Sequence, residues 1–280
     1  MDALPNNCLQ HDPSMNFFAQ ASAAERYSRY RPYFHPVVIE RIHAYLSLKT
    51  QVAQALDVGC GTGQSTWALK RLAKSIVGVD ISASMLAQAQ ASPQIRYLTA
   101  PAEAIPLPNE SCDLITSSLA FHWFERERFL AETQRLLKPR GWLIIYNNGF
   151  LGQMVENPAF THWHNEVYLP RYPSPPRNAQ PLTADQASSF GLDFPHQELY
   201  QNQVTFSVEE VAAYLTTQSN VIHAVEQGAE RLQAVYAWLV ETISPLFAAQ
   251  SARFAFGGYI WYLCNSRYAA PARSAKAESG

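Results

Sequence analysis

The chain has 280 residues, of which 48% are hydrophobic and 16% are charged, and its formal net charge is −2. This composition excludes a disordered chain, and the length suffices to bury a full α/β core in one domain or in one domain with a cap. The nearly neutral charge argues against a nucleic-acid-binding surface, so we expect no nucleic-acid partner. The four cysteines are scattered without a C-x-x-C pair, which indicates neither a zinc site nor a disulfide framework.

The amino terminus and the longest apolar segment both indicate in which cellular compartment the protein is expected. The first residues lack the basic and apolar regions of a signal peptide. The longest apolar run, residues 255–264, is too short to span a bilayer. We therefore expect a soluble, cytoplasmic protein that has no membrane partner.

Two helices are predicted before the first strand. Residues 1–14 carry no pattern and are expected to form a loose tail. From Asn16 an aromatic and arginine-rich segment predicts a helix that ends before Pro32, because proline disfavours helical geometry in the residue that precedes it. A second helix is predicted from Pro36 to Leu48, with proline in its first turn and an apolar stripe along one face.

The region of residues 50–150 alternates between strand-like and helix-like segments, which is typical of βαβ units. Ser82 or Ser84 is the expected N-cap of the second helix in this region. Three prolines keep residues 100–108 extended. The predicted strands cover 52–58, 76–80, 94–99, 113–117 and 142–146, and the predicted helices cover 64–73, 84–91 and 125–137.

The sequence changes character after this alternation. Residues 149–198 are rich in proline and aromatic residues and lack a clean period in their second half. We interpret about residues 151–198 as an insertion that folds over the core as a lid. The capping box Ser207–Glu210 predicts the start of a helix. The remaining predictions are strands at 198–206 and 255–264, helices at 207–215 and 230–243, and a polar tail at 266–280.

A glycine-rich turn lies at the centre of the predicted α/β unit. The stretch Leu56–Gly63 reads Leu-Asp-Val-Gly-Cys-Gly-Thr-Gly, so an apolar strand runs directly into three glycines at alternate positions. Glycine lets a backbone approach a ligand closely and tolerates positive φ. Asp80 ends the next strand about 20 residues further on, where an acid typically binds a ribose diol. A turn that only needs small residues would explain the glycines but neither Asp57 nor Asp80.

Four blocks of the sequence resemble the class I S-adenosylmethionine (SAM) methyltransferases. Residues 56–63 are similar to motif I of that family, and Gly-Val-Asp-Ile-Ser at 78–82 is similar to its ribose-binding strand end. Ala-Glu-Ala-Ile-Pro-Leu-Pro at 102–108 resembles the loop on the adenine side. Leu-Leu-Lys-Pro-Arg-Gly-Trp-Leu at 136–143 resembles the motif that precedes the fifth strand.

Two shorter matches narrow the resemblance. Tyr30-Arg31-Pro32 and His122-Trp123 look like a small-molecule subgroup that includes trans-aconitate methyltransferase-like and ubiquinone/menaquinone-type enzymes. The resemblance implies an α/β, Rossmann-like, doubly wound fold, with a seven-stranded sheet whose last strand is antiparallel, N-terminal helices and the inserted lid. It implies one methyltransferase domain over residues 15–265, with its core at 50–150 and C-terminal strands and helices at 199–265.

The resemblance also implies SAM as cofactor and S-adenosylhomocysteine as product. Asp80 would accept hydrogen bonds from both ribose hydroxyls, and the backbone of Gly59–Gly63 would line the methionine and ribose. Ile81 and Met85 would pack on the adenine faces. The adenine-side loop departs from the usual Gly-Asp-Ala-Glu, since residues 100–103 read Ala-Pro-Ala-Glu. The implied cofactor-binding residues are Arg31, Asp57, Gly59, Cys60, Gly61, Gly63, Asp80, Ile81, Met85, Ala102, Glu103 and Ser118.

His122 follows the fourth strand, where the family places residues that face the methyl group. It is the candidate catalytic residue, either as a base or as a group that orients the acceptor. A histidine that merely fixes the loop is at least as good an explanation. Tyr27, Tyr30 and Trp123 join His122 as candidate substrate-binding residues, with packing as the alternative role. Arg31 could pair with the SAM carboxylate, pair with an acidic acceptor, or be a solvated arginine at a helix end.

The leading hypothesis is a methyltransferase that acts on a small organic acceptor at oxygen, a carboxylate oxygen being one option, or at carbon. Two alternatives stay open: a tRNA-modifying methyltransferase of the same fold, and a SAM-binding regulator without turnover. His162, His164 and Glu166 have spacing that suggests a metal site, but without a further ligand they do not define one, and no metal is expected. The acceptor and the oligomeric state are not determined by the sequence.

Overall fold

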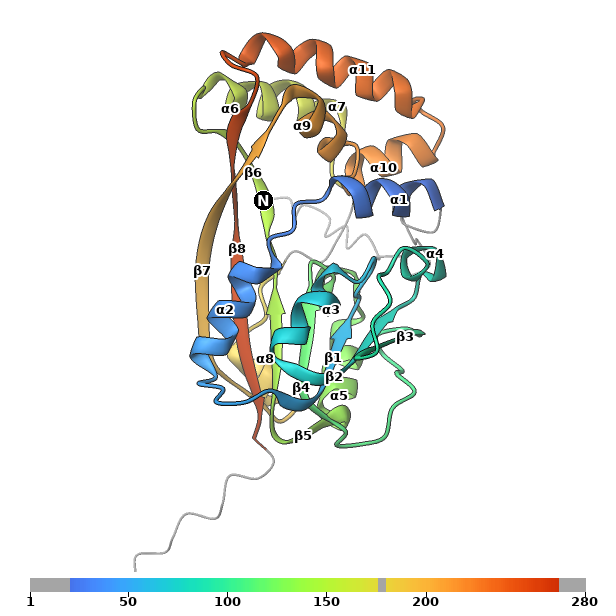
Figure 1. Cartoon of the computed structure of the whole chain (residues 1–280), viewed down its shortest axis with the longest axis vertical. Helices are drawn as coiled ribbons and strands as arrows, with labels where there is room; N and C mark the ends of the chain where they lie inside the picture. The colour runs from blue at the N-terminus through green and yellow to red at the C-terminus, as the bar shows by residue number, and fades with distance from the viewer. Residues whose placement is uncertain (1–20, 176–179, 267–280) are drawn as a thin grey trace, which may run out of the picture.

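A mixed sheet of eight strands runs the length of the described part of the chain (Figure 1). The computed structural model describes residues 21–175 and 180–266. The expected tail 1–14, the predicted helix start at Asn16 and the expected polar tail beyond residue 266 lie outside these residues.

Five parallel strands form one side of the sheet, in the spatial order β3-β2-β1-β4-β5. Strand β8 runs antiparallel beside β5, which confirms the predicted antiparallel last strand, and β7 pairs antiparallel with β8. The chain reverses its direction of winding between β1 and β4, which is where open α/β sheets bind ligands. The strands are β1 (Val52–Val58), β2 (Ala73–Asp80), β3 (Ile95–Thr99), β4 (Cys112–Ser118), β5 (Leu137–Tyr146), β7 (Leu192–Phe206) and β8 (Ala252–Asn265).

One further strand departs from the predicted seven. Strand β6 (Gly149–Met154) pairs with the first half of β8, beyond the part of β8 that pairs with β5. Residues 149–198, whose second half shows no clean period in the sequence, thus contain regular structure in their described part. The segment also forms α6 (Ala159–Trp163), a π-helical turn (His164–Tyr168), α7 (Leu169–Arg171) and α8 (Ala184–Ser188). Its aromatic side chains are buried from several sides, so no polar face produces the helical period that would have predicted these elements.

Most of the remaining helices lie close to their predicted positions. The helix α10 was not predicted. These helices are α1 (Ala21–Tyr30), α2 (His35–Tyr45), α3 (Gln64–Ala68), α4 (Ala83–Leu86), α5 (Arg126–Leu136), α9 (Val208–Leu215), α10 (Ser219–Glu226) and α11 (Leu232–Ile243). Short 3-10 turns at Leu69–Arg71, Phe121–Trp123 and Ser244–Leu246 follow α3, β4 and α11.

Two predicted helix starts are confirmed in atomic detail. The hydroxyl of Ser82 accepts a hydrogen bond from the backbone N–H of Met85 and so caps α4. The capping box of Ser207 and Glu210 begins α9. Helix α4 ends at Leu86 and does not continue to residue 91 as predicted. The next residues turn through bonds to the third residue back, which leads the chain into β3.

Helices cover both faces of the sheet, as expected for a doubly wound fold. One face packs against the apolar stripe of α2 and against the segment after α3, with Ile39, Ile42 and Leu69 fully buried. The other face packs against α5 and α8, where Phe129 and Ala187 are fully buried. None of the helices described is long and apolar enough to cross a lipid bilayer.

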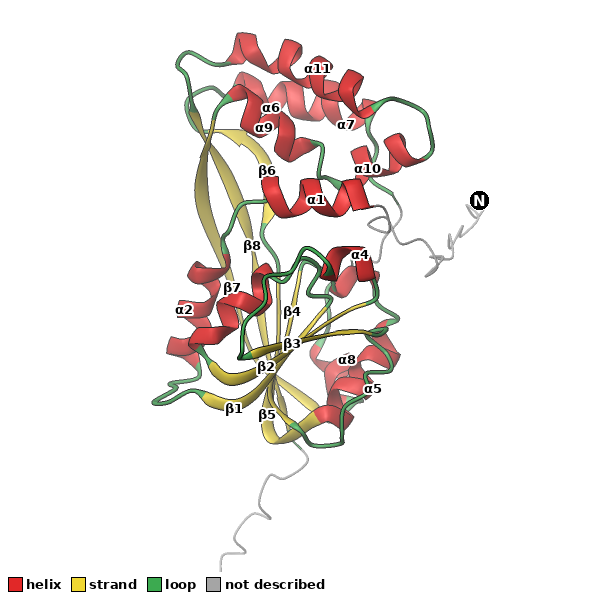
Figure 2. Cartoon of the chain, turned by 45° about the vertical axis from the view of Figure 1, so that its right-hand side comes forward, coloured by secondary structure: helices red, strands yellow, loops and turns green. Residues whose placement is uncertain are grey.

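A third buried cluster lies beyond the carboxyl ends of β1, β2 and β4, and we call the elements that build it the cap (Figure 2). The cap consists of β6, α6, α7, α9, α10, α11, the first part of β8 and the last part of β7. Helix α1 contacts α9 of the cap on one side and α4 on the other. The cap therefore draws on segments both inside and beyond the predicted lid, and α1 closes the space beneath it.

Candidate active site

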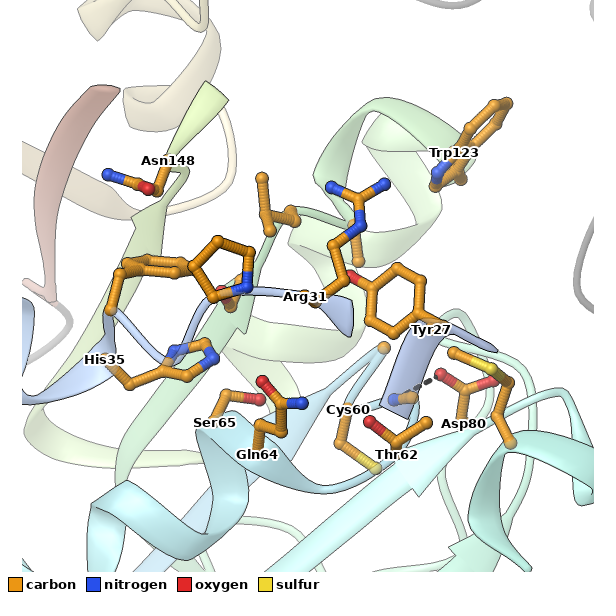
Figure 3. A pocket seen from close by; sticks show the side chains of 18 of the residues that line it. Tyr27, Arg31, His35, Cys60, Thr62, Gln64, Ser65, Asp80, Trp123 and Asn148 are labelled. Atoms are coloured by element: carbon orange, nitrogen blue, oxygen red, sulfur yellow. Dashed lines mark hydrogen bonds between the residues drawn. The ribbon is translucent and has the colours of Figure 1, made fainter. Parts of the chain in front are cut away.

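A cavity opens where the carboxyl ends of β1, β2 and β4 meet, and we call it the inner cavity (Figure 3). Its floor is the glycine turn after β1. Its walls come from the end of α1, from Asp80 at the tip of β2, and from the residues that follow β4. Segments more than a hundred residues apart also contribute, since Asn148, Tyr214 and Phe256 line the same space.

The glycine turn is held tightly against β2. The backbone N–H groups of Gly59 and Cys60 both donate to the carbonyl of Val79, at 2.8 and 3.0 Å. Gly59 and Gly61 have φ of +69° and +53°, a left-handed region that disfavours other residues. A Cβ on Gly61 would lie 2.9 Å from Cε of Met85, and one on Gly59 would collide with Ala120. The turn therefore needs glycine for both its conformation and its close packing.

Asp57 lies beneath the turn and does not line the inner cavity. It is fully buried, and its carboxylate accepts hydrogen bonds from three hydroxyls: Ser65 at 2.6 Å, Thr66 at 2.7 Å and Thr116 at 2.8 Å. Burial raises the pKa of Asp57 to about 6, and the three hydroxyls oppose part of that rise. Asp57 thus ties the start of α3 and strand β4 to β1, and positions the turn from below.

Asp80 lies at the tip of β2 and lines the inner cavity. One carboxylate oxygen accepts from the N–H of Gly61 and the other from the N–H of Ser82, both at 2.8 Å. Burial raises the pKa of Asp80, while these backbone donors act in the opposite direction. A carboxylate offers about four acceptor positions, so each oxygen keeps capacity for one hydroxyl of a diol.

Arg31 lines both the inner cavity and a second space that adjoins it. Its guanidinium donates to the carbonyl of Thr217 at 2.7 Å and lies over the rings of Tyr27 and Tyr214. The Nε atom is buried without a hydrogen-bond partner, and no acid pairs with Arg31 among the described residues. A buried cation of this kind favours an anionic ligand.

The second space, which we call the outer cavity, has a volume of about 560 Å³ and lies between the sheet and the cap. The two cavities share Tyr27, Arg31, Leu119, Trp123, Asn148 and Tyr214 as lining residues. The outer cavity alone is also lined by His122 and Arg126 from the sheet side, and by His164 and Asn220 from the cap. No aspartate or glutamate is among its described lining residues.

The structure brings most of the candidate site residues to these two cavities. Those that line the inner cavity are Tyr27, Arg31, Gly59, Cys60, Gly61, Asp80, Met85, Ser118 and Trp123, and His122 lines the outer one. Asp57, Gly63, Ala102, Glu103, Ile81 and Tyr30 do not line either cavity. Of these, Glu103 accepts a hydrogen bond from the N–H of Glu125, and Ile81 is 60% exposed beside the cavity.

Several lining residues were missed by sequence reasoning. His35 and Asn148 line the inner cavity, and Arg126 and His164 line the outer one. A π-helical turn begins at His164, and such turns are often found at functional sites. No pattern in the sequence indicates this turn. Of these four residues, only His35 has a local feature in the sequence that marks its place: it directly precedes the proline in the first turn of α2. Within the described residues, no group of three or more His, Cys, Asp or Glu could hold a metal ion.

Comparison with known proteins identifies the family. The profile of a family described as a methyltransferase domain matches residues 56–145. A malonyl-[acyl-carrier protein] O-methyltransferase from Marinomonas sp. is 38% identical over 200 residues, which cover 69% of this chain and 71% of the relative. The chain belongs to the class I SAM-dependent methyltransferases. The family predicted from the sequence is thereby confirmed, whereas the subgroup stays a prediction.

Several other relatives match over about half of this chain. An uncharacterized methyltransferase from Mycobacterium tuberculosis is 34% identical over 142 residues, which cover 50% of this chain and 55% of the relative. The chain spans about half the length of the first curated relatives it matches. A solved structure of a candidate type II methyltransferase from Anaeromyxobacter dehalogenans has a TM-score of 0.64 at 24% identity and covers 83% of this chain and 97% of that one. This likeness confirms the Rossmann-like fold.

The inner cavity has groups that fit parts of SAM. Gly59 and Gly61 line it without side chains that would hold a ligand off. Asp80 lines it and keeps acceptor capacity for a ribose diol. Arg31 also lines it, with an Nε that is buried without a hydrogen-bond partner and suits a carboxylate.

The stability of the parent protein and of an Asp57→Asn variant should depend differently on pH. Because the folded state raises the pKa of Asp57 from 3.8 to about 6, the folded protein holds this proton more tightly than the unfolded chain does. The resulting stability is fully present below about pH 4 and is lost as pH rises through about 6. The unfolding free energy of the parent minus that of the variant should fall by on the order of 1–3 kcal/mol from about pH 4 to pH 7 in urea titrations. A difference that stays flat or rises would contradict a buried carboxyl at this place.

An Asp80→Ala variant should bind SAM about 1.5–3 kcal/mol more weakly, the range for losing hydrogen bonds to a charged group. The fold should survive, because Asp80 lies at a strand tip and contributes no apolar packing. Calorimetric titration with SAM measures the change, and Asp193→Ala, an exposed acid on β7, is the matched control. Affinity within twofold of the parent would show that Asp80 does not hold the ribose.

Proposed function

We propose that this chain transfers a methyl group from SAM to a carboxylate oxygen of a small organic acid. The outer cavity carries this proposal. It adjoins the cofactor cavity, it is large enough for a small acceptor, and it presents two guanidinium groups without an acid among its described lining residues. When bound, SAM supplies a methyl group already activated on a sulfonium, which a carboxylate can attack in line.

The two arginines match the two anions that such a reaction brings together. Arg31 lines both cavities and would take the carboxylate of the cofactor. Arg126 lines only the outer cavity and would take the anionic acceptor. Its guanidinium packs over Phe121, donates to the carbonyl of Gln180 at 2.8 Å and keeps its Nε buried without a partner. Burial lowers the pKa of Arg126, and no aspartate or glutamate among the described residues that line the outer cavity opposes this shift.

The enclosure of the outer cavity supports an acceptor of small size. Aromatic side chains from the cap and the sheet, including Phe150, Tyr168, Tyr214 and Trp261, line it. Such walls hold an acceptor in line with the methyl group and keep water from the sulfonium. The Marinomonas relative is named for a malonyl group on an acyl-carrier protein, and a malonyl group has a free carboxylate.

Two other functions make different demands on the same chain. A tRNA-modifying enzyme needs a basic surface, whereas this chain has a net charge of −2. A regulator that only binds SAM needs no second, enclosed cavity. Incubation with methyl-labelled SAM and, separately, a panel of mono- and dicarboxylic acids, a tRNA pool, or buffer alone distinguishes the three. Label in base-labile esters of the acids supports the proposal, and label in tRNA or in no acceptor overturns it.

An Arg126→Gln variant should raise KM for the preferred acid by about 10- to 100-fold and leave kcat within about threefold, because the charged hydrogen bond holds the acceptor before reaction and takes no part in the displacement. The matched control is Arg128→Gln, two residues along the same helix. Arg128 is exposed and pairs with Glu125 at 3.1 Å, outside both cavities. Steady-state kinetics of both variants provide the comparison. Equal KM values for the Arg126 variant and the parent would remove Arg126 from acceptor binding.

A His122→Ala variant should lose less than about tenfold in kcat, with its larger effect on KM, because a carboxylate is already ionised and needs no base. His122 packs against Trp123, with ring centroids 4.7 Å apart, so its loss should loosen the acceptor wall. The kcat of the parent should also stay flat between about pH 6 and pH 8, around the ordinary pKa of histidine. A loss of 10²- to 10⁴-fold with a rise in rate through about pH 6.5 would instead make His122 a general base and exclude a carboxylate acceptor.

A further inference from the structure

His35 is a buried histidine in the inner cavity that the steps above do not use. It is the first residue of α2, it is 5% exposed, and it lines the cavity beside the glycine turn. Its ring packs against Phe34, with centroids 4.3 Å apart, and meets the ring of Tyr146 edge-on. The ring of His35 is thus packed against aromatic side chains, and the next question is which of its two nitrogens carries the proton.

The phenol of Tyr146 fixes that proton. Nδ1 of His35 lies 3.1 Å from the hydroxyl of Tyr146, which is 1% exposed. Of these two groups, the phenol is the stronger donor and the imidazole nitrogen is the stronger acceptor, so we take the phenol to donate to Nδ1. The proton of the neutral imidazole then lies on Nε2.

We infer that His35 donates its Nε2–H to the carboxylate of the cofactor's methionine moiety, beside Arg31. The inference rests on the proposed binding of SAM. In Figure 3, His35 and Asp80 lie at opposite sides of the cavity, so a cofactor whose ribose is at Asp80 directs its amino-acid end toward His35. Arg31 and His35 both line this cavity, one as a charged donor and the other as a neutral donor.

The neutral state of His35 suits this role. Burial lowers the pKa of His35 to about 3, so the ring stays uncharged at neutral pH. SAM carries an ammonium and a sulfonium close to its carboxylate, and Arg31 adds a third cation, so a protonated His35 would bring a fourth positive charge into the same small space. A neutral N–H donor binds the carboxylate without adding that charge. His35 is therefore a binding residue, and Tyr146 is the residue that positions its tautomer.

The test compares two ligands that differ in one group. Calorimetry would measure the Kd of SAM and of decarboxylated SAM for the parent, His35→Phe and His35→Gln. His35→Phe should weaken SAM binding by about 10- to 100-fold, the range for a charge-assisted hydrogen bond, and change the affinity for decarboxylated SAM by less than about threefold. His35→Gln, whose amide N–H can occupy the position of Nε2, should keep SAM within roughly fivefold of the parent.

The outcomes separate this inference from the proposed function. A parent that binds neither ligand contradicts the proposed use of SAM itself. A parent that binds SAM, with a His35→Phe variant that loses both ligands equally or loses neither, overturns the role of His35 and leaves the proposed function standing. Should His35→Phe fail to fold, Tyr146→Phe and His35→Gln provide the same comparison. Tyr146→Phe removes the hydroxyl that selects the tautomer of His35. It should weaken the binding of SAM and leave the affinity for decarboxylated SAM unchanged, and equal changes for both ligands would overturn the inference.

Discussion

Strand β8 contributes side chains to all three buried clusters, and the rest of the structure depends on this one strand. Its first part buries Phe254 and Phe256 in the cap. Its second part buries Ile260 in the cluster on one face of the sheet and Leu263 in the cluster on the other. Because a strand is stiff and β7 pairs with it along its whole length, cap and sheet are held at a fixed separation. The outer cavity is the space left between them.

That separation makes it possible to bury charged groups whose partners come from distant parts of the chain. Arg31 ends the first helix, and the cap supplies both the carbonyl of Thr217 and the ring of Tyr214 that hold it. Asp57 lies in the first strand, and hydroxyls from α3 and β4 donate to its carboxyl group, although burial still raises its pKa. In both cases the partners of an ionisable group come from separate segments, so the folded arrangement positions the group before any ligand binds.

The sequence predicted those features that depend on local backbone geometry. The glycine turn, the acid at the tip of β2 and the capping box of α9 each follow from a few adjacent residues, and the structure contains all three. The cap could not be predicted in the same way. Its aromatic residues are buried from more than one side, so they show no amphipathic period, and residues such as Asn148 and Tyr214 meet only through tertiary packing. Arg126 lies at the start of the predicted helix 125–137, and nothing in the local pattern indicates that it lines a cavity.

For the proposed carboxylate acceptor, the two kinds of wall in the outer cavity have opposite effects on the reaction. A carboxylate and a sulfonium carry opposite charges, and their products, an ester and a thioether, carry neither charge. Charge is therefore lost on the way to the transition state, and an apolar, water-poor wall such as that formed by Phe150 and Trp261 disfavours the reactants more than the transition state. Arg126 does the reverse, since it stabilises the full negative charge of the acceptor before reaction. The aromatic wall should therefore govern kcat, and Arg126 should govern KM. The uncharged ester product should dissociate from Arg126 more readily than the acid does.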